Sequence, residues 1–247
     1  ASAAAESILA DVPGAAIDVW QLDLADLGSV RDFAAGLGET HPQVDLLLNN
    51  AGVMALPRGT TADGFERQFG TNHLGHFALT GLLLERLLAA PAPRVVTVSS
   101  LMHRSGRMHF DDLQGERSYG RWSAYGQSKL ANLLFMYELQ RRSDAAGTPL
   151  RSLAAHPGYS ATNLQSHTGS AIETTVMRIL NRTIAQRDEM GALPSLYALT
   201  MELPGGTYVG PGGIAEGRGH PKVVSASGAA RDPEDARRLW EASEELT

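Results

Sequence analysis

The 247-residue chain contains no cysteine, and this absence excludes several kinds of chemistry at once. Disulfide bonds, thiolate catalysis and cysteine-ligated metal sites all require a side chain that the sequence lacks. Eight histidines are present, but none lies in an H-x-x-x-H or comparable cluster. His73 and His76, three residues apart, are more typical of packing or edge positions, so we predict no metal site. The lack of cysteine fits a reducing compartment and favours a cytoplasmic protein.

Long apolar runs and basic blocks are missing as well. No apolar run reaches about 18 residues, the length that suggests a membrane-spanning helix. The longest candidate, residues 79–90, is interrupted by Glu85 and Arg86. The formal net charge is −6, whereas nucleic-acid-binding proteins usually carry a basic patch. We therefore expect no nucleic-acid partner and no membrane span in this chain.

What the sequence does contain is an alternation of short apolar segments with helical patterns. Its length and its 43% hydrophobic residues suit a single α/β domain over residues 1–247. Strands that alternate with helices predict a doubly wound, parallel sheet. The predicted strands are residues 15–23, 44–52, 93–100 and 150–158, and the predicted helices are residues 29–37, 64–90, 123–143, 188–200 and 233–245.

Two details of these elements follow from local chemistry. Asp26 or Ser29 can cap the helix at 29–37, because both side chains accept hydrogen bonds from free backbone N–H groups. The continuous apolar run at 44–52 is typical of a strand buried on both faces. The glycine-rich stretch 210–215 matches a dinucleotide fingerprint only loosely. Since no strong strand precedes it, we interpret it as a loop near the edge of the sheet.

Small and polar residues gather where the four predicted strands end. Ligands of parallel α/β sheets bind beyond the carboxyl ends of the strands. Taken singly, each of these ends has an ordinary explanation as a turn, a helix cap or a strand-to-loop transition. Taken together, they predict a binding edge. The ends are Asp23, residues 49–52, Ser99 with Ser100, and residues 156–158.

Tyr125 and Lys129 are spaced i and i+4 at the head of a long helical pattern, so both side chains share one helical face. An ammonium near a phenol favours the phenolate and lowers the tyrosine pKa from about 10. That change brings the phenol closer to acid–base work near neutral pH. On its own, the pair could also be the exposed edge of a helix.

The chain resembles the short-chain dehydrogenase/reductase family in five motifs, which occur in the same order as in that family. The resemblance covers roughly residues 18–200. A single Y-x-x-x-K motif is weak evidence, but five motifs in the family's order leave little room for chance. The motifs are N-N-A-G at residues 49–52, TNHLGHFALT with Asn72, the strand that ends at Ser100, Y-x-x-x-K at residues 125–129, and P-G-x-x-x-T at residues 157–162.

The spacing of two motifs resembles one branch of that family. Ser100 and Tyr125 are 25 residues apart, whereas the classical members keep the two much closer. The pattern is similar to the retinol-dehydrogenase-like and WW-domain-oxidoreductase-like branch. This resemblance implies NAD or NADP as the cofactor and an apolar carbonyl or alcohol as the substrate. It also allows a homo-oligomer.

The resemblance also implies roles for individual residues. Tyr125 would transfer the proton, Ser100 would bind the carbonyl oxygen, and Lys129 would tune the tyrosine and bind the nicotinamide ribose. Asn72 would help to position Lys129 through a water. Residues 159–187 would form a lid over the substrate, and apolar residues of the segment 101–122 would either pack on the domain or line the cleft. The cofactor would contact Asp23 and Leu24 near the adenine, Asn50, Ala51 and Gly52 along its length, and Pro157, Gly158 and Thr162 at the nicotinamide end.

The first βαβ unit expected of this fold is not visible in the sequence. That unit would bring the glycine-rich phosphate cradle and the residue that selects NAD or NADP. Without it, the strands at 15–23 and 44–52 lack the two neighbours that belong between them, and an unpaired apolar edge is an aggregation hazard. The alternative function is therefore a non-catalytic relative that binds a ligand or partner. The joint presence of Asn72, Ser100, Tyr125 and Lys129 favours the enzyme.

We predict that the native gene encodes roughly 40–60 further residues before Ala1, enough for the missing part of a βαβ arrangement. They should contain an apolar strand followed directly by a G-x-x-x-G-x-G type of turn. Sequencing upstream of the codon for Ala1, or measuring the intact mass of the native protein, tests this expectation. A native chain that starts at Ala1 would contradict it and favour the non-catalytic alternative.

Overall fold

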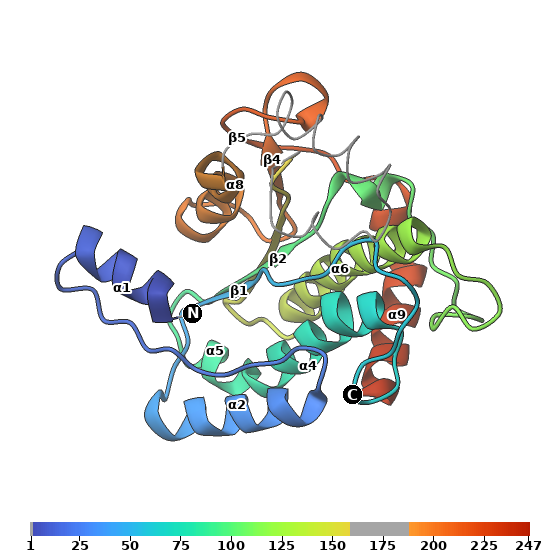
Figure 1. The fold of residues 1–247 in the computed structure, drawn as a ribbon. Helices are drawn as coiled ribbons and strands as arrows, with labels where there is room; N and C mark the ends of the chain where they lie inside the picture. Colours follow the sequence, from blue (N-terminus) through green and yellow to red (C-terminus); the bar gives the residue numbers. More distant parts are fainter. Residues whose placement is uncertain (1, 159–187) are drawn as a thin grey trace.

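Four parallel strands form the centre of the protein in the computed structural model, which describes residues 2–158 and 188–247 (Figure 1). The strands follow one another in space as they do in the chain, and a short fifth strand is antiparallel at the far edge. The doubly wound α/β class predicted from the sequence is confirmed. In order, the strands are β1 (Leu46–Asn49), β2 (Arg94–Val98), β3 (Arg151–Ala155), β4 (Tyr208–Pro211) and β5 (Pro221–Val223).

Helices cover both faces of the sheet, as parallel strands require. The helix α6 (Arg121–Ala145) lies on one face, and α8 (Asp188–Thr200) lies on the other. Successive residues of β2 point to opposite faces. Val95 belongs to a core cluster with residues of α6, whereas Val96 packs with Ala198 of α8. On the outer side of α6 lies α9 (Pro233–Leu246), as Figure 1 also shows.

Most of the predicted helices are present close to their predicted bounds. The helix expected at 29–37 is α2 (Leu27–Thr40), and the Asp26 carboxylate caps it by accepting hydrogen bonds from Gly28 N at 2.8 Å and Ser29 N at 3.3 Å. The stretch 64–90 is helical but interrupted. It consists of α3 (Arg67–Phe69), the π-helical turn η1 (Gly70–Leu74), α4 (Gly75–Leu82) and α5 (Leu84–Leu88).

Short helical segments complete the described part of the chain. A 3₁₀ turn follows β2 after two residues, at the start of the segment 101–122. At the N-terminus, α1 extends away from the remainder and buries none of its residues (Figure 1). These segments are α1 (Ser2–Asp11), η2 (Leu101–Arg104), η4 (Ile214–Glu216) and η5 (Ala229–Arg231).

Two predictions about strands are wrong, and in both cases a neighbouring strand that the prediction requires is absent from the described residues. Residues 15–23 form no strand, and Val19 and Trp20 are 50% and 39% exposed. The described residues place no strand beside this segment, so its backbone has no ladder to join. The prediction of a strand buried on both faces at 44–52 is also wrong, because β1 is the edge strand and Leu46 remains 47% exposed.

The stretch 210–215 needs a partial correction. A short strand, β4, runs to Pro211 and therefore does precede the glycine-rich loop, contrary to the sequence interpretation. The sequence pattern did not predict this strand, because it has only four residues and two of them, glycine and proline, are uncommon in strands. The loop itself lies at the sheet edge, as predicted, between β4 and β5. In the part of the chain that the structure describes, no helix is long and apolar enough to cross a membrane.

Candidate active site

The four residues predicted to carry chemistry come together beyond the carboxyl ends of β1 and β2. The helix α6 brings Tyr125 and Lys129, and the turn that follows β2 begins with Ser100. Asn72 lies in η1, a π-helical turn of the kind that often marks a functional site. Local helix periodicity therefore places Tyr125 beside Lys129, but only the tertiary fold brings Ser100 and Asn72 to them.

Lys129 is buried, and its ammonium is held at the end of β2. The Nζ atom donates a hydrogen bond to Val98 O at 3.1 Å. The loop after β1 passes so close that a Cβ on Gly52 would lie 3.5 Å from this Nζ and 2.8 Å from Asn72 Oδ1. A Cβ at position 52 would therefore overlap Asn72 Oδ1 and come into ordinary contact with the ammonium, so the close approach to Asn72 favours glycine.

Asn72 connects the loop after β1 to α6. Its Oδ1 accepts a hydrogen bond from Val53 N at 2.7 Å, and its Nδ2 donates to Val53 O at 2.8 Å and to Ser128 Oγ at 2.9 Å. Ser128 Oγ in turn donates to Tyr125 O at 2.8 Å. The direct contacts of Asn72 thus go to Val53 and Ser128, and its predicted link to Lys129 through a water stays a prediction.

Tyr125 and Ser100 form the outer part of the site. Tyr125 is 6% exposed, the side chain of Ser100 is near enough to its phenol to affect the phenol's pKa, and Lys129 Nζ lies 5.8 Å from the centre of its ring. Ser100 Oγ also accepts a hydrogen bond from Met102 N at 3.2 Å, which caps η2. Met102 N uses one of the two lone pairs of the serine oxygen, which leaves the O–H free to donate.

Burial dominates the electrostatics of the pair on α6. It raises the pKa of Tyr125 to about 12, and the neighbouring side chain of Ser100 only partly opposes this rise. Burial also lowers the pKa of Lys129 to about 8. The predicted net lowering of the tyrosine pKa is thus wrong. The desolvation of the phenolate raises the pKa by more than the neighbouring groups lower it. The phenol keeps its proton at neutral pH.

Four of the residues predicted to line the cofactor lie just beyond two strand ends. Asn50 and Ala51 follow β1 and are exposed, while Pro157 and Gly158 follow β3 and are half-buried. Gly158 has φ +71°, and a Cβ there would overlap Gly217 O. Thr162, like the lid predicted at 159–187, lies outside the described residues.

Asp23 and Leu24, predicted to lie near the adenine, precede α2. Asp23 is exposed, and its side chain accepts a hydrogen bond from Ala25 N at 2.9 Å. Leu24 is buried in the core, where its carbonyl oxygen approaches Gly75 so closely that a Cβ would overlap it. The contacts that these two residues, Asn50, Ala51, Pro157 and Gly158 would make with a cofactor stay predictions.

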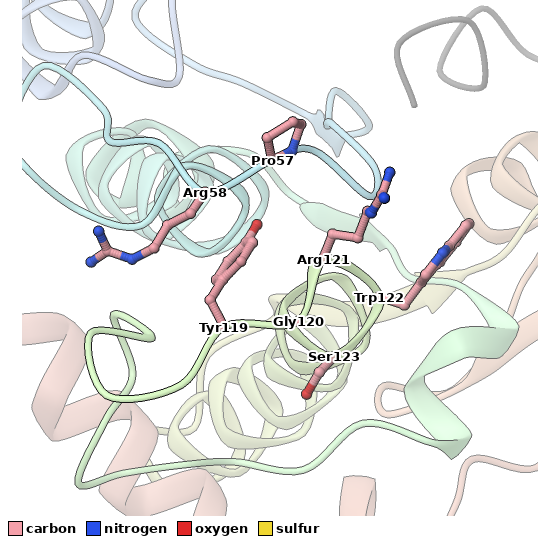
Figure 2. A pocket seen from close by; sticks show the side chains of 7 residues that line it. All are labelled: Pro57, Arg58, Tyr119, Gly120, Arg121, Trp122 and Ser123. Atoms are coloured by element: carbon pink, nitrogen blue, oxygen red, sulfur yellow. The ribbon is translucent and has the colours of Figure 1, made fainter. Parts of the chain in front are cut away.

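An open cavity of about 550 Å³ adjoins the start of α6 (Figure 2). Trp122 and Arg121 contribute to it from α6, and Pro57 and Arg58 contribute from the loop after β1. The Trp122 ring lies edge-on to Tyr125, with 6.4 Å between the ring centres. Tyr125 itself does not line the cavity, but it neighbours one of the residues that do. It is lined by Pro57, Arg58, Tyr119, Gly120, Arg121, Trp122 and Ser123.

The cavity contains three residues that the sequence analysis missed, Arg121, Pro57 and Arg58, whereas Tyr119 and Trp122 belong to the segment 101–122 that was expected to pack or to line the cleft. Arg121 precedes Tyr125 by four residues, so the helical spacing alone could have indicated a shared face. Pro57 and Arg58 carried no such signal. Of the apolar residues between Ser100 and Tyr125, Tyr119 and Trp122 line the cavity, whereas Met108, Phe110 and Leu113 pack against the hydrophobic core.

The two histidines of the TNHLGHF stretch are packing residues, as predicted. Both are buried, and His73 Nε2 is hydrogen-bonded to Ser243 Oγ at 2.8 Å, while His76 Nδ1 is bonded to Asn72 O at 3.0 Å. Burial lowers their pKa values to about 3 and about 4. Among the described residues, no group of three or more histidines and carboxylates is placed to hold a metal ion.

Comparison with known proteins gives this geometry a context. The model of a family described as short chain dehydrogenase matches residues 1–173. Human retinol dehydrogenase 13 is 42% identical over 251 residues, which cover 99% of this chain and 72% of that protein. Mouse polyprenol dehydrogenase is 43% identical over 233 residues, with 92% and 67% covered. A crystal structure of a Mycobacterium paratuberculosis protein has a TM-score of 0.77 at 46% identity, and the match covers 98% of this chain and 79% of that one.

The burial of Lys129 leads to a direct test. The chain has only two lysines, Lys129 and Lys222, so protein grown with ¹³C-labelled lysine gives two Cε resonances to follow by NMR. We expect the Lys129 resonance to titrate with a midpoint near pH 8, because burial disfavours the ammonium. The Lys222→Arg protein, which keeps a single lysine, assigns the signal. A midpoint at or above the usual value of about 10.4 would contradict the prediction.

Proposed function

Because the chain belongs to the short-chain dehydrogenase family and is an NAD(P)-dependent oxidoreductase, we propose that it transfers a hydride between the nicotinamide and an apolar carbonyl or alcohol. Tyr125 is the proton donor or acceptor in this proposal. The observation that carries it is the meeting of Asn72, Ser100, Tyr125 and Lys129 at one edge of the sheet. The non-catalytic alternative is set aside, whereas the cytoplasmic location and a homo-oligomer stay predictions.

The loop after β1 fits the nicotinamide half of the cofactor. Gly52 leaves no side chain between the backbone and Lys129, and exposed Asn50 and Ala51 offer their backbone to an approaching molecule. Lys129 has three N–H donors, of which Val98 O takes one, so donors remain for the ribose hydroxyls. When bound there, the cofactor supplies the hydride. The residues of the chain supply position and the proton.

Tyr125 is suited to the proton transfer of carbonyl reduction. Its raised pKa keeps the phenol protonated at neutral pH, so it can donate when negative charge develops on the substrate oxygen. As the proton leaves, the new phenolate lies beside the Lys129 ammonium and within hydrogen-bonding reach of Ser100, and both stabilise it. For oxidation of an alcohol the same groups act in reverse, with the phenolate accepting the hydroxyl proton.

The cavity in Figure 2 supports an apolar body for the substrate. A substrate whose oxygen is at Tyr125 and whose far end points away from Lys129 reaches Trp122 within one helical turn, about 5.4 Å. The indole and Pro57 offer it apolar surface. Arg58 donates hydrogen bonds to Gly115 O and Gln114 O, which fixes the wall of the cavity opposite the helix.

The acid–base role predicts the effect of removing one hydroxyl. With a carbonyl substrate on which the wild type is active, Tyr125→Phe should lower kcat by at least about 10²-fold, the range of general acid catalysis, and it should leave the fold intact. NAD(P)H absorbance measures turnover, and circular dichroism checks folding. Tyr137→Phe, on the same helix but packed against the core, is the matched control and should remain active. Near-wild-type turnover of Tyr125→Phe would refute the role.

The substrate proposal predicts a dependence on chain length. On a panel of aldehydes and ketones, kcat/KM should rise with the length of the apolar chain, and small polar or charged carbonyls should be poor substrates. Trp122→Ala should lower kcat/KM for long substrates by about 10- to 150-fold, because burial of such a contact is worth about 1.5–3 kcal/mol, and it should leave short substrates nearly unaffected. Trp20→Ala, which removes an exposed tryptophan elsewhere, is the control. Equal or better rates on small polar carbonyls would rule out the apolar preference.

A further inference from the structure

A fully buried histidine, His103, makes two hydrogen bonds to the backbone of Ser100. It follows the serine by three residues, and two of its groups donate to the same atom. The backbone N–H of His103 donates to Ser100 O at 3.1 Å, and the ring Nδ1 is hydrogen-bonded to that oxygen at 2.6 Å. A carbonyl oxygen has two lone pairs, and one residue occupies both. The orientation of the peptide that follows Ser100 is therefore tied to the imidazole.

The other side of the ring fixes which nitrogen carries the proton. Ser227 N donates to His103 Nε2 at 3.2 Å. A backbone N–H can only donate and a carbonyl can only accept, so Nε2 must be bare and Nδ1 must hold the hydrogen. Both contacts therefore require the same neutral tautomer, and burial lowers the pKa of His103, which favours the neutral ring.

The ring and its segment have little freedom to move. The imidazole lies edge-on to Tyr208 of β4, with 5.6 Å between the ring centres. Three residues later, Gly106 presses on α6 so closely that a Cβ would overlap Gly126 O, next to Tyr125. The stretch from Ser100 to Gly106 is thus wedged between β4 and the turn of α6 that carries the tyrosine.

From this geometry we propose that His103 is a positioning residue that holds Ser100 at the distance from Tyr125 needed for proton transfer. The inference rests on the proposed function, in which Ser100 binds the reacting oxygen. His103 does not line the cavity of Figure 2, so it acts through the serine. Loss of its hold on Ser100 should therefore lower kcat and leave the KM for substrate largely unchanged.

Two substitutions separate positioning from packing. The side-chain amide nitrogen of His103→Asn takes the place of Nδ1 and can still donate to Ser100 O, but it leaves Ser227 N without its partner. The amide of His103→Gln reaches the place of Nε2 and can accept from Ser227 N, but it releases Ser100 O. Both variants remove the ring from Tyr208, so a residue that only fills the core would lose similar amounts in both.

We expect kcat of His103→Gln to lie at least about tenfold below that of His103→Asn, since small misplacements near reacting atoms can cost up to about 10²-fold. KM should stay within about threefold in both variants. Turnover is expressed per cofactor-binding site, so partial misfolding does not distort the comparison. Should the Gln variant not fold, His103→Asn alone still decides, because kcat near the wild-type value is expected and a tenfold loss would overturn the proposal.

The Ser100→Ala protein distinguishes a failure of the proposed positioning role of His103 from a failure of the proposed catalytic function. In that background the difference between the Asn and Gln variants should vanish, because the group that His103 positions is gone. Full activity of Ser100→Ala would overturn the proposed role of the serine and this inference with it. Equal kcat in the two His103 variants, alongside an impaired Ser100→Ala, would overturn the positioning role alone.

Discussion

The end of β2 is joined to α6 by a reciprocal set of buried hydrogen bonds, and the site depends on this junction. Val98 O accepts from Lys129 Nζ at 3.1 Å and from Asn132 Nδ2 at 3.0 Å, while Ser99 Oγ donates to Lys129 O at 2.7 Å. Strand and helix therefore hold each other at the residue that carries the charge. A buried ammonium is costly unless such partners are supplied, and the junction supplies one while keeping other donors available.

The alternation of side chains along β2 explains why two neighbouring serines have different environments. Successive residues of a strand point to opposite sides. Ser99 is buried and bonded to α6, whereas Ser100 is half-buried, begins η2 and meets the phenol of Tyr125. The first hydroxyl joins the strand to the helix, whereas the second caps η2 through Met102 N and keeps its O–H available for the site. A shift of the strand by one residue would exchange these two environments.

The electrostatics of the site also follow from burial. Both titratable groups on α6 move toward their neutral forms, with the pKa of Tyr125 raised and that of Lys129 lowered. Strongly shifted pKa values in a polar, partly accessible site are typical of functional residues. The protein thus holds a phenol that keeps its proton beside an ammonium that is less stable than in water. This arrangement suits a reaction in which the phenol becomes charged and the ammonium gains a partner.

The sequence by itself determined what depends on near neighbours. Helix periodicity placed Tyr125 beside Lys129, local capping chemistry predicted Asp26 or Ser29 as a cap, and the ordered motifs indicated both the α/β fold and the family. Such features are readable because they depend on residues within one or two turns. Only the tertiary structure decided which predicted strands find a partner, and so residues 15–23 form none and β1 remains an exposed edge.

The structure likewise decided the sign of the Tyr125 pKa shift, since desolvation is a property of the assembled core. The hydrogen bond between Ser227 and His103 joins residues 124 positions apart in the sequence. No local sequence pattern predicts a bond over that separation. Pairing, burial and long-range hydrogen bonds depend on which distant segments meet, and that is settled only when the chain is folded.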